Sequence, residues 1–268
     1  MMPYPHIDPV ALQLGPVSIR WYGLAYVAGF LCGLKYMLWQ VDQGRGAPLT
    51  RPHVDNLFAW VILGILLGGR LGYVLFYNLA YYFEHPLHIL FTWQGGMSYH
   101  GGLLGVITAT LLFCWRYQLN FTDVMDKIAP CVPLGLFFGR LANFINGELY
   151  GRVTTVPWGM VFPHGGPLPR HPSQLYEAVL EGLVLFALLH VTARRSPPRF
   201  TLSGLFLVGY GVFRFGVEFF RQPDDLPELH GPAFQFLSMG QWLSLPMIVL
   251  GLILLGLAYS RRNQHVAA

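Results

Sequence analysis

The stretch GRLANFINGELYGR, residues 139–152, is polar although it follows an apolar run, residues 129–138. That run is typical of the body of a membrane helix, and Arg140, Asn143 and Gly147 fall on one helical face. A guanidinium is costly near hydrocarbon, so we expect Arg140 to face protein, a cavity or a bound head group. For Glu148 there is an equal alternative to a buried site, which is a position at a helix end where the chain runs into a solvated loop.

Composition indicates a membrane protein. Of the 268 residues, 54% are hydrophobic and only 11% are charged, with a mean hydropathy of +0.45. Soluble domains average about 25% charged residues. Several apolar runs reach the ~20 residues that cross a bilayer core, and the short alternating segments of a β-barrel are missing. The sequence therefore predicts an all-α integral membrane protein. We expect no metal and no cofactor, because no acidic or histidine cluster has ligand spacing.

Hydropathy predicts about seven transmembrane helices. They cover residues 19–38, 57–76, 97–115, 124–144, 173–191, 202–219 and 236–259. Basic residues fall in alternate connections, at Lys35, Arg45, Arg51, Arg116, Lys127, Arg194, Arg195, Arg199, Arg261 and Arg262. The positive-inside rule then places the N-terminus outside and the C-terminus in the cytoplasm. We expect a single polytopic membrane domain, 1–268, with an outer loop near 152–172 that forms a small periplasmic cap.

A second polar pattern lies in the apolar segment YGVFRFGVEFFR. Tyr210, Arg214, Glu218 and Arg221 recur at intervals of four, four and three residues, so they form one helical stripe. Such a stripe is expected to line a cavity filled with water or ligand. The alternative is a structural ion pair between Arg214 and Glu218 that needs no ligand. Such a pair does not explain Tyr210 and Arg221. Arg70 lies beside a glycine pair, and the sequence leaves open whether it binds a ligand or has a structural role.

His100 lies in GGMSYHGGLLG, where glycines permit close backbone approach. A neutral imidazole near pH 7 can accept a proton, which suits a general base, and a packed core histidine is the alternative. Tyr22, in RWYGLAY, is a candidate site residue or an aromatic of the membrane interface. Arginines bind phosphate through paired N–H donors, so two or three of them with apolar walls suit a phospholipid.

These motifs together resemble one family. HGGLLG, GRLANFINGELYGR, RHPSQLYE, FRFGVEFFRQPD and WYGLAY are similar to the phosphatidylglycerol–prolipoprotein diacylglyceryl transferases of the bacterial inner membrane. The resemblance implies seven spans, with the N-terminus outside and the active site toward the periplasm. It implies transfer of the sn-1,2-diacylglyceryl group from phosphatidylglycerol to the lipobox cysteine thiol of prolipoprotein signal peptides, with release of glycerol phosphate. It further implies that Arg140 contacts phosphatidylglycerol, and that the other functional positions are Tyr22, His100, Asn143, Gly151, Arg214 and Glu218.

The implied reaction is displacement by a thiolate, which needs a base because a thiol of pKa ~8.5 is a poor nucleophile. His100 is the candidate base, ahead of Tyr210 and Tyr22. Arg140 and Arg214 are expected to stabilise the departing phosphate. We expect Asn143 to orient Arg140 or bind the lipid, and Glu218 to hold Arg214. The expected substrate-binding residues are Arg140, Asn143, Gly151, Glu218 and Tyr210.

Two other functions remain as alternatives. Another membrane phospholipid-head-group transferase is the first, but its metal-dependent kind needs several aspartates on facing helices, and the spans have almost none. The second is a lipid transporter without chemistry, for which repeated, broken half-helices would be expected. Neither pattern is found, and no nucleic-acid partner is indicated.

Overall fold

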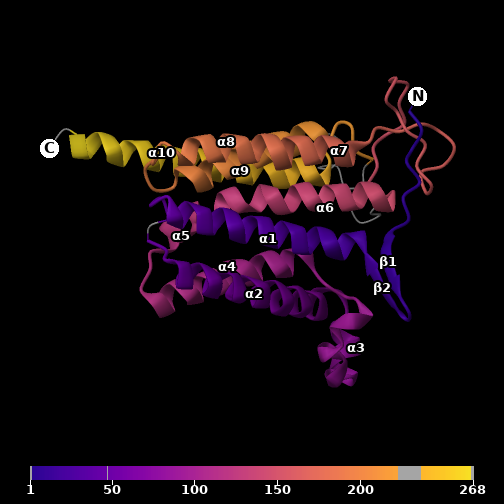
Figure 1. Ribbon diagram of the computed structural model, residues 1–268, viewed down its shortest axis with the longest axis horizontal. Coiled ribbons are helices and arrows are strands. Elements are labelled where there is room, and N and C mark those ends of the chain that lie inside the picture. Colours follow the sequence, from indigo (N-terminus) through magenta and orange to yellow (C-terminus); the bar gives the residue numbers. More distant parts are fainter. Residues whose placement is uncertain (1, 47, 223–236, 267–268) are drawn as a thin grey trace. The chain divides into compact units, whose positions relative to one another are not determined.

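The computed structural model describes residues 2–46, 48–222 and 237–266, and these residues are mostly helical (Figure 1). The chain forms two compact units, one of Met1–Tyr36 with Asp126–Ala268 and the other of Met37–Met125. Within the described ranges, five helical segments are long and apolar enough to cross a membrane. They are Trp21–Asp42, Arg51–Tyr77, Phe121–Asn146, Ser173–Ala193 and Met239–Ser260. The prediction of a helical, multi-pass membrane protein is confirmed at this level.

The first unit begins with an antiparallel hairpin, β1 (Val10–Leu14) and β2 (Val17–Arg20), that leads directly into α1 (Trp21–Asp42). The predicted first span, 19–38, is confirmed as a long apolar helix, but the helix begins two residues later, because Ile19 and Arg20 belong to β2. Gly15 makes the turn with a φ of +58°, a value that glycine adopts without strain. A strand of four residues is too short to show a period in a hydropathy window.

Four helical segments form the rest of the first unit. The segment from residue 121 consists of α5 (Phe121–Ile128), η3 (Ala129–Cys131) and α6 (Val132–Asn146). The next consists of α7 (Ser173–Glu177), the π-helix η4 (Ala178–Val184) and α8 (Leu185–Ala193). The last two are α9 (Thr201–Val217) and α10 (Met239–Val266). In Figure 1, α6 lies along α7 and α8, and α9 packs against α10. The predicted seventh span began at residue 236, which lies outside the described residues.

The second unit pairs two long helices through glycine. It contains α2 (Arg51–Tyr77), α3 (Leu79–Glu84), η1 (Pro86–Leu90), η2 (Thr92–Gln94) and α4 (Tyr99–Tyr117). Gly64, Gly68 and Gly72 recur every four residues on the face of α2 that meets α4. A Cβ added to Gly72 would lie 2.7 Å from the Cα of Gly101. These glycines therefore allow α2 and α4 to pack closely, since an added Cβ would clash with the backbone of α4.

Arg70 on α2 has a structural role. Its side chain is 5% exposed, and Nε donates to the Ile89 carbonyl at 2.7 Å. Nη1 donates to the carbonyls of Gly95 and Gly96 at 2.6 and 3.1 Å, and Nη2 donates to that of His88 at 2.5 Å. One guanidinium thus donates hydrogen bonds to the carbonyls at the ends of η1 and η2 that have no partner within their helices. Residues 79–94 form a set of short helices that this residue holds in place.

Replacing Arg70 with Met should lower the free energy of unfolding by about 3 kcal/mol or more, because several buried carbonyls lose their donor. Thermal unfolding of the detergent-solubilised protein measures the change. Arg51→Met is the matched control, because Arg51 pairs with Asp42 at the surface, where their side chains are 62% and 41% exposed. Arg51→Met should lower the free energy of unfolding by less than about 1 kcal/mol. Equal effects of the two variants would contradict the structural role.

Candidate active site

Arginines and glutamates from three segments meet inside the first unit, and Glu177 is the centre of this group. The Arg140 Nε on α6 lies 2.9 Å from Oε2 of Glu177 at the end of α7. Arg214 on α9 forms an ion pair and a hydrogen bond with the other oxygen, Oε1. One carboxylate therefore holds two guanidiniums side by side. We call the group of Arg140, Glu177, Glu181, Arg214, Glu218 and Arg221 the arginine–glutamate cluster.

The acids of the cluster are deeply buried. Glu177 and Glu181 are both 0% exposed, and Arg140 Nη2 approaches Glu181 Oε2 at 3.6 Å. Neither oxygen of Glu181 accepts a hydrogen bond within the described part of the chain. Gly182 brings these acids close to α6, because a Cβ there would lie 2.7 Å from the Cβ of Phe137. The wide turns of η4 lie at this contact, and π-helical turns are frequent at functional sites.

Sequence reasoning missed Glu177 and Glu181. The structure places Glu177 between Arg140 and Arg214. A signal was present, because the two acids are four residues apart in an apolar segment and so share a helical face. Two acids on one face within a membrane span need cationic partners. This signal would have paired them with Arg140 or Arg214.

The charged members of the predicted stripe lie close together, although α9 ends at Val217 and Arg221 lies beyond the helix in an isolated β-bridge. Arg214 Nη2 lies 3.0 Å from Glu218 Oε2, and Arg221 Nη1 lies 4.0 Å from the same oxygen. The expectation that Glu218 contacts Arg214 is therefore confirmed. The self-contained Arg214–Glu218 pair is wrong as an alternative, because Arg214 also binds Glu177. Tyr210 is half-buried, and its ring stacks on Phe206 with centroids 5.9 Å apart.

Asn143 lies at the end of α6, one turn beyond Arg140. Its Nδ2 donates to Glu148 Oε1 at 2.8 Å, so its recorded side-chain partner is Glu148 and not Arg140. Helix α6 ends at Gly147, whose φ of +67° is a left-handed cap. Gln174 Nε2 then donates to the Glu148 carbonyl at 2.6 Å. The RHPSQ motif thus fixes the turn that follows the arginine-bearing helix.

Gly151 joins three distant parts of the chain. Its N–H donates to the His171 carbonyl at 2.8 Å, and it pairs with Arg221 in an isolated β-bridge. A Cβ on Gly151 would clash with the Phe220 carbonyl oxygen and would lie 2.6 Å from the His171 Cβ. The structure therefore gives this glycine a packing role, which holds Arg221 beside the rest of the cluster.

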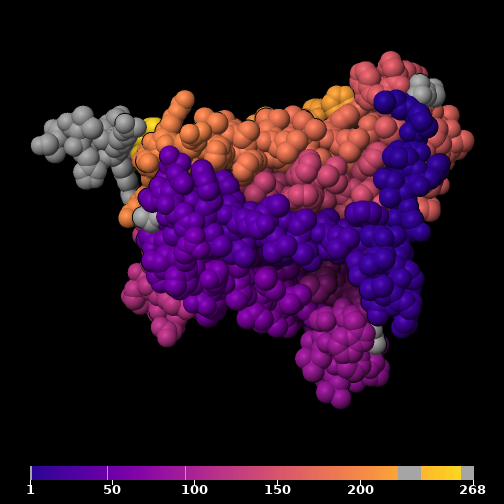
Figure 2. Space-filling model, in the orientation of Figure 1, coloured from indigo at the N-terminus to yellow at the C-terminus, as the bar shows by residue number. Residues whose placement is uncertain are grey.

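The loop of residues 152–172 is packed against the N-terminal segment. Tyr4, Phe144, Met160 and Phe162 form a small buried core. The Tyr4 hydroxyl donates to the Phe144 carbonyl at 2.6 Å, which ties this core to the end of α6. Burial raises the pKa of Tyr4, so the hydroxyl stays a donor. Figure 2 shows the indigo N-terminal segment lying against this loop.

His100 and Tyr22 are two further predicted site residues. His100 is exposed in the first turn of α4, in the second unit, and its ring meets the edge of the Tyr99 ring at 5.6 Å. Tyr22 is 37% exposed in the first turn of α1, and its hydroxyl accepts a hydrogen bond from Tyr26 at 3.4 Å. Within the described residues, Tyr22 forms no hydrogen bond with a member of the arginine–glutamate cluster.

The chain is similar to proteins of one family over nearly its whole length. A family model described as "Prolipoprotein diacylglyceryl transferase" matches residues 9–257. A relative from Nitratidesulfovibrio vulgaris (strain DP4), named phosphatidylglycerol–prolipoprotein diacylglyceryl transferase, is 56% identical over 95% of this chain and 96% of its own. Relatives of the same name from Nitrosomonas europaea and Coxiella burnetii (strain RSA 331) are 52% and 51% identical. They cover 97% and 98% of this chain, and 92% and 100% of their own.

Replacing Gly151 with Ala should lower the free energy of unfolding by about 1–3 kcal/mol, because the added methyl must displace Phe220 or His171. Thermal unfolding in detergent measures the change. Gly216→Ala is the matched control, because a Cβ at Gly216 meets nothing within 4 Å. It should leave stability unchanged or slightly raised, since alanine favours a helix. A neutral Gly151→Ala variant would refute the packing role.

Proposed function

The chain belongs to the prolipoprotein diacylglyceryl transferase family, and we propose that it transfers an sn-1,2-diacylglyceryl group from phosphatidylglycerol to the lipobox cysteine thiol of prolipoprotein signal peptides. The products are a thioether-linked lipoprotein precursor and glycerol phosphate. The observation that carries the proposal is the Glu177 bridge, which holds Arg140 and Arg214 side by side within apolar helices. Paired guanidiniums in such surroundings suit the phosphate of a membrane lipid.

The protein is proposed to act in the bacterial inner membrane as one polytopic domain of seven spans. The five long apolar segments supply five of them, and the shorter helices α4 and α9 supply the other two. Basic residues in alternate connections support an outer N-terminus and a cytoplasmic C-terminus. In this orientation the end of α6 and the loop of residues 152–172 face the periplasm. The loop would then be the small cap over the site.

The head group is proposed to bind to donors of Arg140 and Arg214. The recorded pairs of Arg140 use Nε and Nη2, so Nη1 is the atom proposed to meet the phosphate. Glu177 is a positioning residue, because it fixes both guanidiniums without touching the reacting carbon. Asn143, Gly151, Glu218 and Tyr210 are the further residues proposed for substrate binding. The acyl chains would lie along the apolar helices.

The proposed reaction is a displacement at the glyceryl C3 carbon. The cysteine sulfur forms the S–C bond, the C–O bond to phosphate breaks, and the thiol proton passes to a base. The phosphate changes from a diester with one negative charge to a monoester that carries up to two. Arg140 and Arg214 would stabilise this gain of charge by about 3 kcal/mol each. His100 is the proposed base, with Tyr22 and Tyr210 as the alternatives.

The purified protein, mixed with phosphatidylglycerol and a lipobox peptide, tests the function directly. Loss of the peptide thiol together with a diacylglyceryl mass gain supports the transferase. A phosphatidyl mass gain would instead indicate a different head-group transferase. Lipid movement across a vesicle without thiol loss would indicate a transporter.

Replacing Arg140 with Ala should reduce transfer by roughly 10²–10³-fold or more, because a donor to the leaving phosphate is lost. The protein should still insert and fold, since Glu177 keeps its bond to Arg214. The peptide assay and thermal unfolding measure the two effects. Arg140→Lys, which keeps the charge but not the fork of donors, should lose less activity. Lipidation at the wild-type rate by the alanine variant would remove Arg140 from the mechanism.

Replacing His100 with Gln should reduce kcat by about 10²–10⁴-fold and leave phosphatidylglycerol binding nearly unchanged, because only proton transfer is removed. Raising the pH toward the thiol pKa of ~8.5 should restore part of the turnover, since thiolate then forms without a base. Steady-state kinetics and a lipid-binding measurement separate the effects. The exposed His85→Gln variant is the control and should keep wild-type kinetics. A raised KM with unchanged kcat would exclude the base role.

A further inference from the structure

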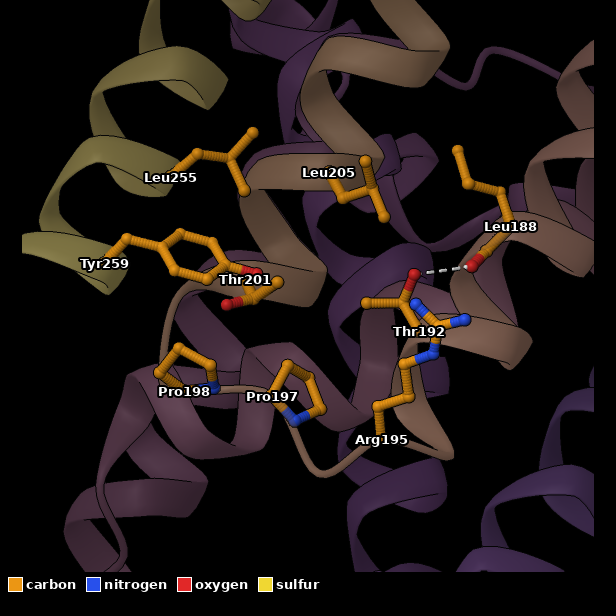
Figure 3. A pocket seen from close by; sticks show the side chains of 9 residues that line it. All are labelled: Leu188, Thr192, Arg195, Pro197, Pro198, Thr201, Leu205, Leu255 and Tyr259. Carbon is orange, nitrogen blue, oxygen red and sulfur yellow. Dashed lines mark hydrogen bonds between the residues drawn. The ribbon is translucent and has the colours of Figure 1, made fainter. Parts of the chain in front are cut away.

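A cavity of about 540 Å³ opens between α8, α9 and α10 in the first unit (Figure 3). Thr201, which lines it, is the first residue of α9, whereas Arg214 is near the end of that helix. Thirteen residues separate the two, so the cavity lies roughly 20 Å along α9 from the arginine–glutamate cluster. None of the residues assigned to the proposed reaction lines it.

The cavity is polar at one end and apolar at the other. Arg195 lies in the loop that connects α8 to α9, Thr201 is the first residue of α9, and Tyr259 lies seven residues before the end of α10. Leu205 and Leu255 lie one turn further into the helices. Figure 3 shows the two leucines on the side of the cavity away from the loop prolines, Pro197 and Pro198. An amphiphile with a polar head and an apolar chain matches this order.

Two polar groups in the cavity have no recorded partner in the described part of the chain. Thr201 is 2% exposed, and its hydroxyl forms no hydrogen bond, which is costly for a buried group. The Arg195 side chain is exposed, and no ion pair is recorded for it in that part. The nearby acid Asp126 is already engaged, because it accepts from the Ser203 N–H and hydroxyl at 2.8 and 2.6 Å. A ligand that accepts hydrogen bonds and carries negative charge would satisfy both groups.

We propose that this cavity binds an anionic phospholipid, with the phosphate on Arg195 and Thr201 and an acyl chain along Leu205 and Leu255. The phosphate diester is the acceptor that an arginine fork and a hydroxyl recognise together. Arg194 and Arg199 in the same connection add positive charge, and residues 194–200 contain no acid. The leucines favour a lipid over free phosphate. The proposal requires these helices to lie in a membrane but does not depend on the transfer reaction.

Thermal unfolding of the full chain in detergent, with added phosphatidylserine, tests the proposal. Phosphatidylserine should raise Tm, whereas phosphatidylcholine and inorganic phosphate should not. Arg195→Gln should weaken the apparent affinity for phosphatidylserine by about tenfold or more, and Arg195→Lys should restore part of it. Arg194→Gln is the matched control, since Arg194 is exposed in the same connection and does not line the cavity.

Two further variants complete the test. Thr201→Val should raise Tm without lipid, because the buried hydroxyl is gone, and should reduce the shift that phosphatidylserine produces. Arg140→Ala should keep the full shift, which separates this cavity from the proposed reaction site. The proposal is overturned if Arg195→Gln keeps the wild-type affinity, or if Arg194→Gln weakens it equally. An equal shift with phosphatidylcholine or inorganic phosphate, or loss of the shift in Arg140→Ala, would also overturn it.

Discussion

The rest of the site depends on one carboxylate, Glu177, which lies between two guanidiniums. Arg140 and Arg214 belong to different helices, and their like charges would repel each other strongly where water is scarce. Glu177 removes that obstacle by contributing one oxygen to each arginine. Its helix must approach α6 closely for this, and Gly182 permits the approach. The pair of guanidiniums is therefore a product of the packing of three segments.

The sequence was sufficient to identify the arginines and most of the helices, because both leave a local signal. Membrane spans are long apolar runs, and an arginine inside such a run is conspicuous. The pairing of Arg214 with Glu218 is also local, since four residues separate them. The bond between Arg214 and Glu177 joins residues that are 37 positions apart, so no helical period relates them. Only the tertiary packing reveals that the two arginines share an acid.

Other features could not be predicted because their partners are backbone atoms. Arg70 donates to five carbonyls, and carbonyl groups occur at every residue, so no side-chain pattern marks the ones it binds. Gly151 is similar, since the atoms it must avoid belong to Phe220 and His171, far along the chain. The hairpin of β1 and β2 was hidden for another reason. Its second strand has only four residues and is followed directly by α1.

The balance of charge in the cluster bears on how an anionic substrate could turn over. Three arginines accompany three glutamates, Glu177, Glu181 and Glu218, so the formal charges are matched. A matched cluster attracts a phosphate through fixed donors and not through a large net positive charge. In the proposed reaction, such a cluster would interact most strongly with the charge that develops as the C–O bond breaks, which is the stage at which stabilisation accelerates a reaction. After that reaction, the acids already present would compete with the released phosphate for the same guanidiniums, and this competition would favour its departure.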